Sequence, residues 1–170
     1  QLNVSDDPEA NLPTTVAAVH AAAGMGAKFV LTPEVTNCVS TSRAHQQAVL
    51  QTQNEDRTLQ ALRAAAAACG VHLLIGSLAL KTDDPDGRFA NRSFLVAPDG
   101  AILAQYDKIH MFDVAITESE TYRESAGYRP GSRAVVARTP LGCLGLAICY
   151  DMRFARLADA LAGAGAEILT

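Results

Sequence analysis

The sequence has no long hydrophobic run and no cluster of basic residues. No apolar stretch approaches the roughly 18 residues needed to cross a bilayer. The 14 lysines and arginines are outnumbered by 18 acidic residues, which gives a formal charge of −4 at pH 7. Because binding to a phosphate backbone requires a basic surface, we expect neither a nucleic acid nor a membrane as a partner.

Closely spaced cysteines and histidines are also missing. The four cysteines form no Cys-x-x-Cys pair and the four histidines stand singly, whereas zinc sites usually take their ligands in close pairs. A chain of this size does not need disulfides for stability. We therefore expect no metal, free thiols and a reducing, cytoplasmic location. The opening segment 1–4 lacks a basic-then-apolar pattern, so we expect no secretory leader.

No feature of the sequence divides it into parts. It contains no internal repeat, no low-complexity linker and no shift in composition, so we expect one domain over residues 1–170. A hydrophobic content of 49% is typical of a globular protein. The apolar segment 166–170 ends where a strand should be in progress. We expect a domain without its C-terminal part, unstable alone, with a sheet edge that further chain or a partner subunit covers.

Helical and strand patterns alternate, which predicts an α/β protein with sheets covered by helices. Helices are expected at 8–24, 42–51, 57–69 and 154–163, and strands at 28–32, 71–80, 93–97, 101–106, 134–138 and 143–149. Asp99-Gly100 predicts a hairpin turn. Residues 107–133 show no clear periodicity and are expected to form a long functional loop.

Cys149 is the strongest candidate for chemistry. It follows the apolar segment 144–148 and precedes a helical stretch. At such a corner the sulfur would lie at a sheet edge, near helix N–H groups that favour a thiolate. The alternative is a small core residue, and position alone leaves both open. Cys143 is expected in the core, Cys69 on the apolar side of a helix and Cys38 in a polar loop.

Three charged residues are weaker candidates. Glu34 stands at the carboxyl end of a strand, where open α/β sheets hold ligands, and suits a general base or a solvated cap. Lys108 also follows a strand and suits an oxyanion-stabilising cation or a solvated side chain. Glu124 lies in the long loop and carries no signal of its own.

Three segments containing these residues occur in the order Thr32-Pro33-Glu34, Tyr106-Asp107-Lys108-Ile109-His110-Met111-Phe112-Asp113 and Gly145-Leu146-Ala147-Ile148-Cys149-Tyr150-Asp151-Met152-Arg153-Phe154. Together they resemble the signature segments of the nitrilase superfamily, the carbon–nitrogen hydrolases with a Glu-Lys-Cys triad. The resemblance spans nearly the whole chain. One departure is Ala155, where many members have proline.

The resemblance implies a role for each candidate. Glu34 matches the general base, Lys108 the oxyanion-stabilising lysine and Cys149 the nucleophile, while Glu124 matches a second glutamate that positions lysine and substrate. The implied fold is an αββα four-layer sandwich, of which this chain covers the first half to two-thirds. Members of the family usually form homodimers or higher homo-oligomers. We expect the four side chains to converge in one pocket.

The implied reaction is hydrolysis of a small amide through a thioester, giving a carboxylic acid and ammonia or an amine, with no cofactor or metal. The backbone N–H of Tyr150 would help Lys108 hold the oxyanion. The segments most resemble the small-amidase branch, which includes deaminated-glutathione amidases and omega-amidases that act on small anionic compounds. We favour the first. Arg129 or Arg153 is a candidate for a substrate carboxylate, although Arg153 equally suits an ion pair with Asp151.

Other functions remain open at this point. The same triad handles nitriles and N-carbamoyl compounds. From a different class, Cys149 could serve as an oxidisable thiol in a redox or peroxide sensor, although no resolving cysteine is obvious. A third reading is a catalytically inactive binding or dimerisation module.

Overall fold

The central layer of the fold is a four-stranded sheet with the strand order β1-β2-β3-β4. The computed structural model describes residues 2–117 and 120–170, so Gln1 of the opening segment lies outside the described residues. The strands are β1 (Phe29–Leu31), β2 (His72–Leu80), β3 (Ala90–Val96) and β4 (Ile102–Asp107). β1 is parallel to β2, and the other neighbouring pairs are antiparallel. These four strands agree with those expected from the sequence.

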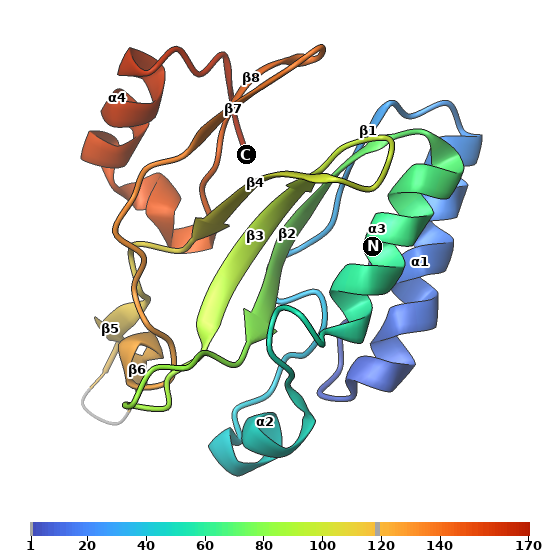
Figure 1. The fold of residues 1–170 in the computed structure, drawn as a ribbon. Coiled ribbons are helices and arrows are strands. Elements are labelled where there is room, and N and C mark those ends of the chain that lie inside the picture. The colour runs from blue at the N-terminus through green and yellow to red at the C-terminus, as the bar shows by residue number, and fades with distance from the viewer. Residues whose placement is uncertain (1, 118–119) are drawn as a thin grey trace.

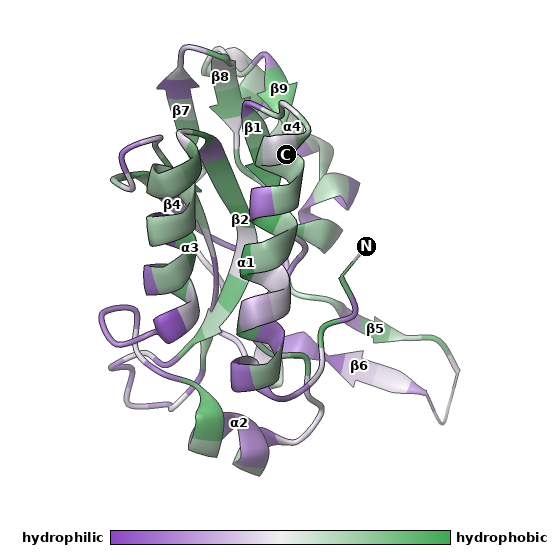
Figure 2. Cartoon of the chain, turned by 90° about the vertical axis from the view of Figure 1, so that its right-hand side faces the viewer, coloured by the Kyte–Doolittle hydropathy of each residue, from purple (hydrophilic) through white to green (hydrophobic). Residues whose placement is uncertain are grey.

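Two helices, α1 (Pro8–Gly24) and α3 (Arg57–Cys69), cover one face of this sheet (Figure 1). The carboxylates of Asp7 and Asp56 accept hydrogen bonds from backbone N–H groups in the first turns, which fixes where the helices begin. Figure 2, in which these helices face the viewer, shows them mostly pale green or white with a few hydrophilic patches, and the hydrophobic strand β2 behind them.

The opposite face of the central sheet packs against a second sheet, with the order β7-β8-β9. Its strands are β7 (Val136–Thr139), β8 (Gly142–Gly145) and β9 (Ile168–Leu169). Successive side chains of a strand point to opposite faces. Leu73 therefore packs beneath the helices, whereas its neighbour Leu74 packs with Leu144 in the core between the sheets.

A further helix, α4 (Ala155–Gly163), covers the outer face of the second sheet. A Cβ atom at Gly145 would lie 3.2 Å from the Cβ of Leu161, so the absence of a side chain at Gly145 lets α4 approach the sheet. The order of layers is helix, sheet, sheet, helix. This confirms the four-layer sandwich expected from the resemblance.

The stretch expected to be one long irregular loop contains regular structure. It forms a hairpin of β5 (Asp113–Ala115) and β6 (Thr121–Arg123), followed by the 3-10 helix η1 (Glu124–Ala126). The strands are three residues long and mostly exposed, so they lack the alternating apolar pattern by which strands are recognised in sequence. A short helix, α2 (Arg43–Val49), lies within the expected range 42–51.

The strand that precedes Cys149 is shorter than expected. β8 ends at Gly145, and residues from Cys149 onward form the 3-10 helix η2 (Cys149–Arg153). Beyond the strand, the carboxylate of Asp151 accepts the backbone N–H of Ile148 at 3.0 Å, so this group is not available to a strand ladder. Among the described residues, no helix combines the length and apolar character needed to cross a membrane.

Candidate active site

Four sequence-predicted residues meet at one end of the core between the sheets. Tyr106 of β4 packs in that core, and Lys108 stands two residues further along the same face. Cys149 follows the mostly buried segment 144–148, which continues from β8 of the second sheet. Glu34 lies beyond the end of β1, and Glu124 begins η1. All four side chains line one cavity of about 510 Å³. The structure thus brings them together, while their roles remain predictions.

Lys108 joins the two glutamates. Its Nζ lies 2.8 Å from Oε1 of Glu34 and 3.0 and 2.9 Å from the two carboxylate oxygens of Glu124, and its side chain is only 2% exposed. Burial lowers the pKa of Lys108, but the hydrogen bonds and charges of both glutamates outweigh burial and raise the pKa overall. Lys108 is therefore a fixed cation between two carboxylates.

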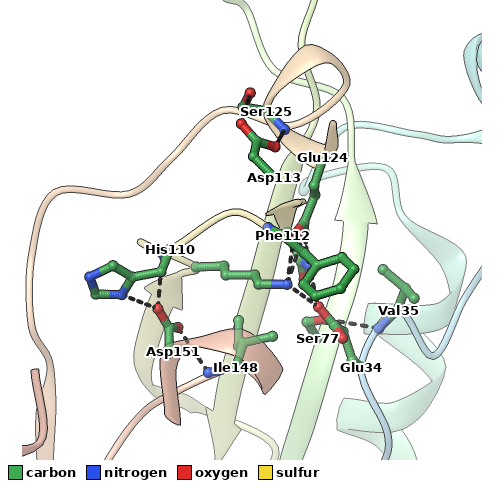
Figure 3. Close-up of polar contacts among 12 residues, drawn as sticks. Glu34, Val35, Ser77, His110, Phe112, Asp113, Glu124, Ser125, Ile148 and Asp151 are labelled. Carbon is green, nitrogen blue, oxygen red and sulfur yellow. Dashed lines mark hydrogen bonds and ion pairs between the residues drawn. The ribbon is translucent and has the colours of Figure 1, made fainter. Parts of the chain in front are cut away.

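Glu124 is held from three sides. Besides Lys108, the backbone N–H of Phe112 donates to its Oε2 at 2.6 Å, and Nδ2 of Asn91 approaches its Oε1 at 3.3 Å. Figure 3 shows Glu124 and Glu34 pointing toward each other from different elements. A rigidly held carboxylate beside the lysine is consistent with a positioning function.

Asn91 is a member of this network that sequence reasoning missed. Its Nδ2 also donates to Oε1 of Glu34 at 2.8 Å, and the residue is 2% exposed. The available signal was an amide at the start of a largely buried strand that also contains Arg92 and Ser93. A single asparagine in a strand has too many ordinary explanations for that signal to have been decisive.

The turn that carries Glu34 depends on a close approach between two strands. A Cβ at Gly76 would lie 2.1 Å from the carbonyl oxygen of Thr32, so only glycine fits there. The next residue, Ser77, accepts the backbone N–H of Val35 on its Oγ at 2.8 Å. Val35 has a φ of +44°, which is unfavourable for a β-branched residue. The surrounding contacts hold this strained backbone directly after Glu34.

Cys149 also has a left-handed backbone, with a φ of +48°, and its side chain is exposed in the cavity. Burial raises the pKa of the Cys149 thiol, the charge of Glu34 and its hydrogen bond to the thiol raise it further, and Lys108 opposes them. The expectation that a helix N-terminus would favour a thiolate is therefore wrong. η2 has only five residues, and burial, followed by the charge of Glu34, raises the pKa of the thiol that begins it.

Asp151 connects the lysine segment to the cysteine segment. Its carboxylate accepts hydrogen bonds from the Tyr106 hydroxyl, the Ile148 N–H, and both the backbone N–H and Nδ1 of His110, at 2.7 to 3.0 Å. Figure 3 shows His110 and Ile148 on either side of it. Asp151 is thus hydrogen-bonded to His110, and the suggested ion pair with Arg153 is not what the structure shows.

The arginines suggested for a substrate carboxylate lie elsewhere. Arg129 pairs with Asp84 and lines a different cavity, and Arg153 is exposed on η2. Arg123 of β6 lines the candidate cavity instead. It was missed because the hairpin that carries it had no strand pattern.

Two further expectations can be compared with the structure. The N–H of Tyr150 lies in the first turn of η2, where helix N–H groups have no intrahelical acceptor. Cys38, expected in a polar loop, is 1% exposed and packs with Leu50 and Phe89, and it also lines the cavity. Among the described residues, no group of three or more His, Cys, Asp or Glu side chains is arranged to hold a metal ion.

The family model described as "Carbon-nitrogen hydrolase" matches residues 1–170. The chain belongs to the carbon–nitrogen hydrolase family. Among curated relatives, it is 37% identical over 146 residues to a deaminated glutathione amidase of Yersinia enterocolitica, covering 85% of this chain and 51% of that protein. It is 33% identical over 169 residues to the omega-amidase NIT2 of Homo sapiens, covering 99% of this chain and 59% of that protein. This carbon–nitrogen hydrolase chain thus spans between half and three fifths of these relatives.

Solved structures share the fold. The NitFhit protein of C. elegans matches with a TM-score of 0.85 at 25% identity, over 98% of this chain and 41% of that one. An amidase from Nesterenkonia sp. AN1 matches with a TM-score of 0.79 at 24% identity, over 99% of this chain and 62% of that one. These likenesses support the four-layer arrangement in this member of the carbon–nitrogen hydrolase family.

Proposed function

We propose that the carbon–nitrogen hydrolase containing this chain is an amidase, which hydrolyses a non-peptide C–N bond of a small substrate through a thioester on Cys149. The observation that carries the proposal is the convergence of one thiol, one fixed ammonium and two carboxylates in a single cavity. An amide carbon is a poor electrophile and water a poor nucleophile, so a thiol that forms a covalent intermediate divides one difficult step into two easier ones.

In the first half of the proposed reaction, Sγ of Cys149 attacks the amide carbon while Glu34 takes the thiol proton. The raised pKa of Cys149 and its hydrogen bond to Glu34 support this assignment, because a protonated thiol requires a base at hand. The C–N bond then breaks, and the proton held by Glu34 leaves with the ammonia or amine.

The negative oxygen of the tetrahedral intermediate needs donors that are already in place. We assign that role to Nζ of Lys108 and the backbone N–H of Tyr150. In the second half, Glu34 takes a proton from water and the resulting hydroxide attacks the thioester carbon. The C–S bond then breaks, Glu34 returns the proton to the Cys149 thiolate, and the acid product leaves. Glu124 holds Lys108 in position throughout.

For the substrate, we propose a small anionic amide of the kind processed by deaminated glutathione amidases and omega-amidases. The names of the relatives support this class, and Arg123 in the cavity wall supplies a positive charge for a substrate carboxylate. Nitriles and N-carbamoyl compounds are the alternatives within the family.

A redox-sensing role is the less favoured candidate. Sensor cysteines have a low pKa, whereas burial raises the pKa of both cavity thiols, Cys38 and Cys149. We also propose a homo-oligomer, as is usual in the family. The four free cysteines support a reducing, cytoplasmic location.

The test is ammonia release by the full-length protein from a panel of monoamides of dicarboxylic and 2-oxodicarboxylic acids, with matched nitriles and N-carbamoyl compounds. We expect turnover of anionic amides, none by Cys149→Ala, and near wild-type turnover by Cys69→Ser, because Cys69 contacts His20 on the helical layer. Undiminished ammonia release by Cys149→Ala would refute the thiol mechanism. Exclusive turnover of nitriles or N-carbamoyl compounds would move the enzyme to those classes.

A further inference from the structure

Asn91 contacts both glutamates of the candidate site and the backbone of Lys108. Its Nδ2 donates to Oε1 of Glu34 at 2.8 Å and to Oε1 of Glu124 at 3.3 Å. Its backbone carbonyl accepts the N–H of Lys108 at 3.0 Å. One residue of β3 therefore fixes the positions of both carboxylates and of the segment that carries the ammonium.

The orientation of the amide is determined by its neighbours. Carboxylates only accept hydrogen bonds when ionised, so the side of Asn91 that faces Glu34 and Glu124 must be the NH₂ group. Its Oδ1 is then turned away from them, and this buried atom has no hydrogen-bond partner among the described residues. A buried, unpaired acceptor is unfavourable for stability, so the stability of the fold does not account for an asparagine here.

The pattern of contacts on Glu34 is equally specific. Both Nζ of Lys108 and Nδ2 of Asn91 bind the same oxygen, Oε1. These two donors, one from β3 and one from the residue that follows β4, hold this oxygen in place. Oε2 is left as the oxygen that can take the thiol proton of Cys149.

We propose that Asn91 is a positioning residue for the reaction, which clamps Oε1 of Glu34 so that Oε2 faces the Cys149 thiol. This inference rests on the proposed function, because it assigns Asn91 a role through the proposed base. Asn91 does not touch the reacting atoms. It acts as a neutral donor between two carboxylates that share a single cation.

The chemistry of the site explains why an amide serves here. An aspartate at position 91 would place a third carboxylate beside Glu34 and Glu124 and would donate no hydrogen bond when ionised. A cationic side chain at position 91 would compete with Lys108 for both glutamates. A leucine of similar size would fill the space but leave Oε1 of Glu34 bound by Lys108 alone.

Steady-state kinetics of the full-length protein give the first test. We expect Asn91→Leu to lower kcat on the order of 10- to 100-fold, the effect of losing a hydrogen bond to a charged group, with KM changed much less. Asn91→Asp should be at least as impaired. Ser93→Ala is the matched control, because Ser93 lies on the same face of β3 and its hydroxyl donates to the Ile75 carbonyl, outside the candidate site. Its kcat should stay close to wild type.

The second test separates positioning from general damage to the fold. The pH dependence of Cys149 alkylation by iodoacetamide gives the pH at which half of the thiol is deprotonated, here called the thiol midpoint. This measurement does not require turnover. Peptide mapping follows the alkylation of Cys38, Cys69 and Cys143 separately. We expect Asn91→Leu to shift the midpoint to lower pH when Glu34 is present and to leave it unchanged in the Glu34→Gln background. A purely structural effect would appear equally in both backgrounds.

The outcomes distinguish the two proposals. Equal midpoint shifts in both backgrounds, or a wild-type kcat in Asn91→Leu, would overturn the role of Asn91 while leaving amide hydrolysis by Cys149 intact. Conversely, if Cys149→Ala retained turnover, the amidase mechanism would fail whatever Asn91 does to the thiol midpoint. Folding of each variant is checked by its far-UV circular dichroism and thermal melt.

Discussion

The hydroxyl of Tyr106 donates to Oδ2 of Asp151 at 2.7 Å, in the interior between the two sheets. This bond joins β4, the strand that leads into Lys108, to η2, the helix that begins with Cys149. Burial raises the pKa of Tyr106, and the hydrogen bond to Asp151 raises it further, so the hydroxyl keeps its proton and remains a donor. The relative placement of the cation and the thiol depends on this contact.

We therefore predict that Tyr106→Phe destabilises the protein by about 1.5–3 kcal/mol, the usual value for a hydrogen bond to a charged group, and lowers kcat as well. Urea unfolding of the full-length protein measures the first effect and ammonia release the second. Tyr122→Phe is the control, because Tyr122 is 48% exposed, and its stability should match wild type. Equal stability of Tyr106→Phe and wild type would contradict the prediction.

For Lys108, we predict that Lys108→Ala lowers kcat by on the order of 10²–10³, the usual cost of losing an oxyanion donor. The variant should also be less stable at neutral pH, because Glu34 and Glu124 would share a site without a cation. Lys28→Ala, an exposed lysine before β1, serves as the control. If kcat fell by less than about threefold, Lys108 would not be the oxyanion donor.

The thiol of Cys149 should respond to Glu34 in an unusual way. Because Glu34 raises the pKa of the thiol, Glu34→Gln should move the midpoint of Cys149 alkylation to lower pH, so that the thiolate forms more readily. Turnover should nevertheless fall nearly as far as in Cys149→Ala, because the base is lost. The wild-type midpoint should lie above the ordinary cysteine value of 9.0. An unchanged midpoint in Glu34→Gln would mean that the two groups do not interact.

The raised pKa of the Cys149 thiol also makes the free energy of unfolding depend on pH. A thiol whose pKa is raised on folding stabilises the native state below its unfolded pKa, and that contribution is lost as the pH rises through the folded value. Wild type should therefore lose stability above about pH 9 more steeply than Cys149→Ala. Parallel stability curves in that range would contradict this assignment.

At the turn before Glu34, we predict that Gly76→Ala destabilises the protein by at least about 2 kcal/mol. The added Cβ would meet the Thr32 carbonyl at 2.1 Å, and backbone would have to move. Gly24→Ala, at the last position of α1 with open space around it, should be neutral or slightly stabilising. A Gly76→Ala variant as stable as wild type would show that the turn can relax.

Much of this architecture could be predicted from the sequence. Apolar periodicity and capping residues such as Asp7 and Asp56 mark long elements with local signals, so α1, α3 and β2 to β4 were recognised close to their observed bounds. The family segments supplied Glu34, Lys108 and Cys149, which no local pattern would have brought together.

What could not be predicted depends on tertiary contacts. The β5–β6 hairpin has exposed three-residue strands, so its sequence shows no periodicity. Asn91 becomes important only when Glu34 and Glu124 meet from different elements. The raised pKa of the Cys149 thiol was not predicted, because its burial and its proximity to Glu34 arise from tertiary contacts that no local pattern contains.

The arrangement of the four layers has a consequence for the order of events during synthesis. Glu34, Lys108 and Glu124 leave the ribosome before Cys149, and the nucleophile meets them only when the second sheet closes onto the first. Until then the thiol lacks its base and its cation, so a nascent chain cannot carry out the proposed reaction. Catalytic competence should therefore arise together with the folded sandwich rather than before it, and regained turnover should report the assembly of the two sheets during refolding.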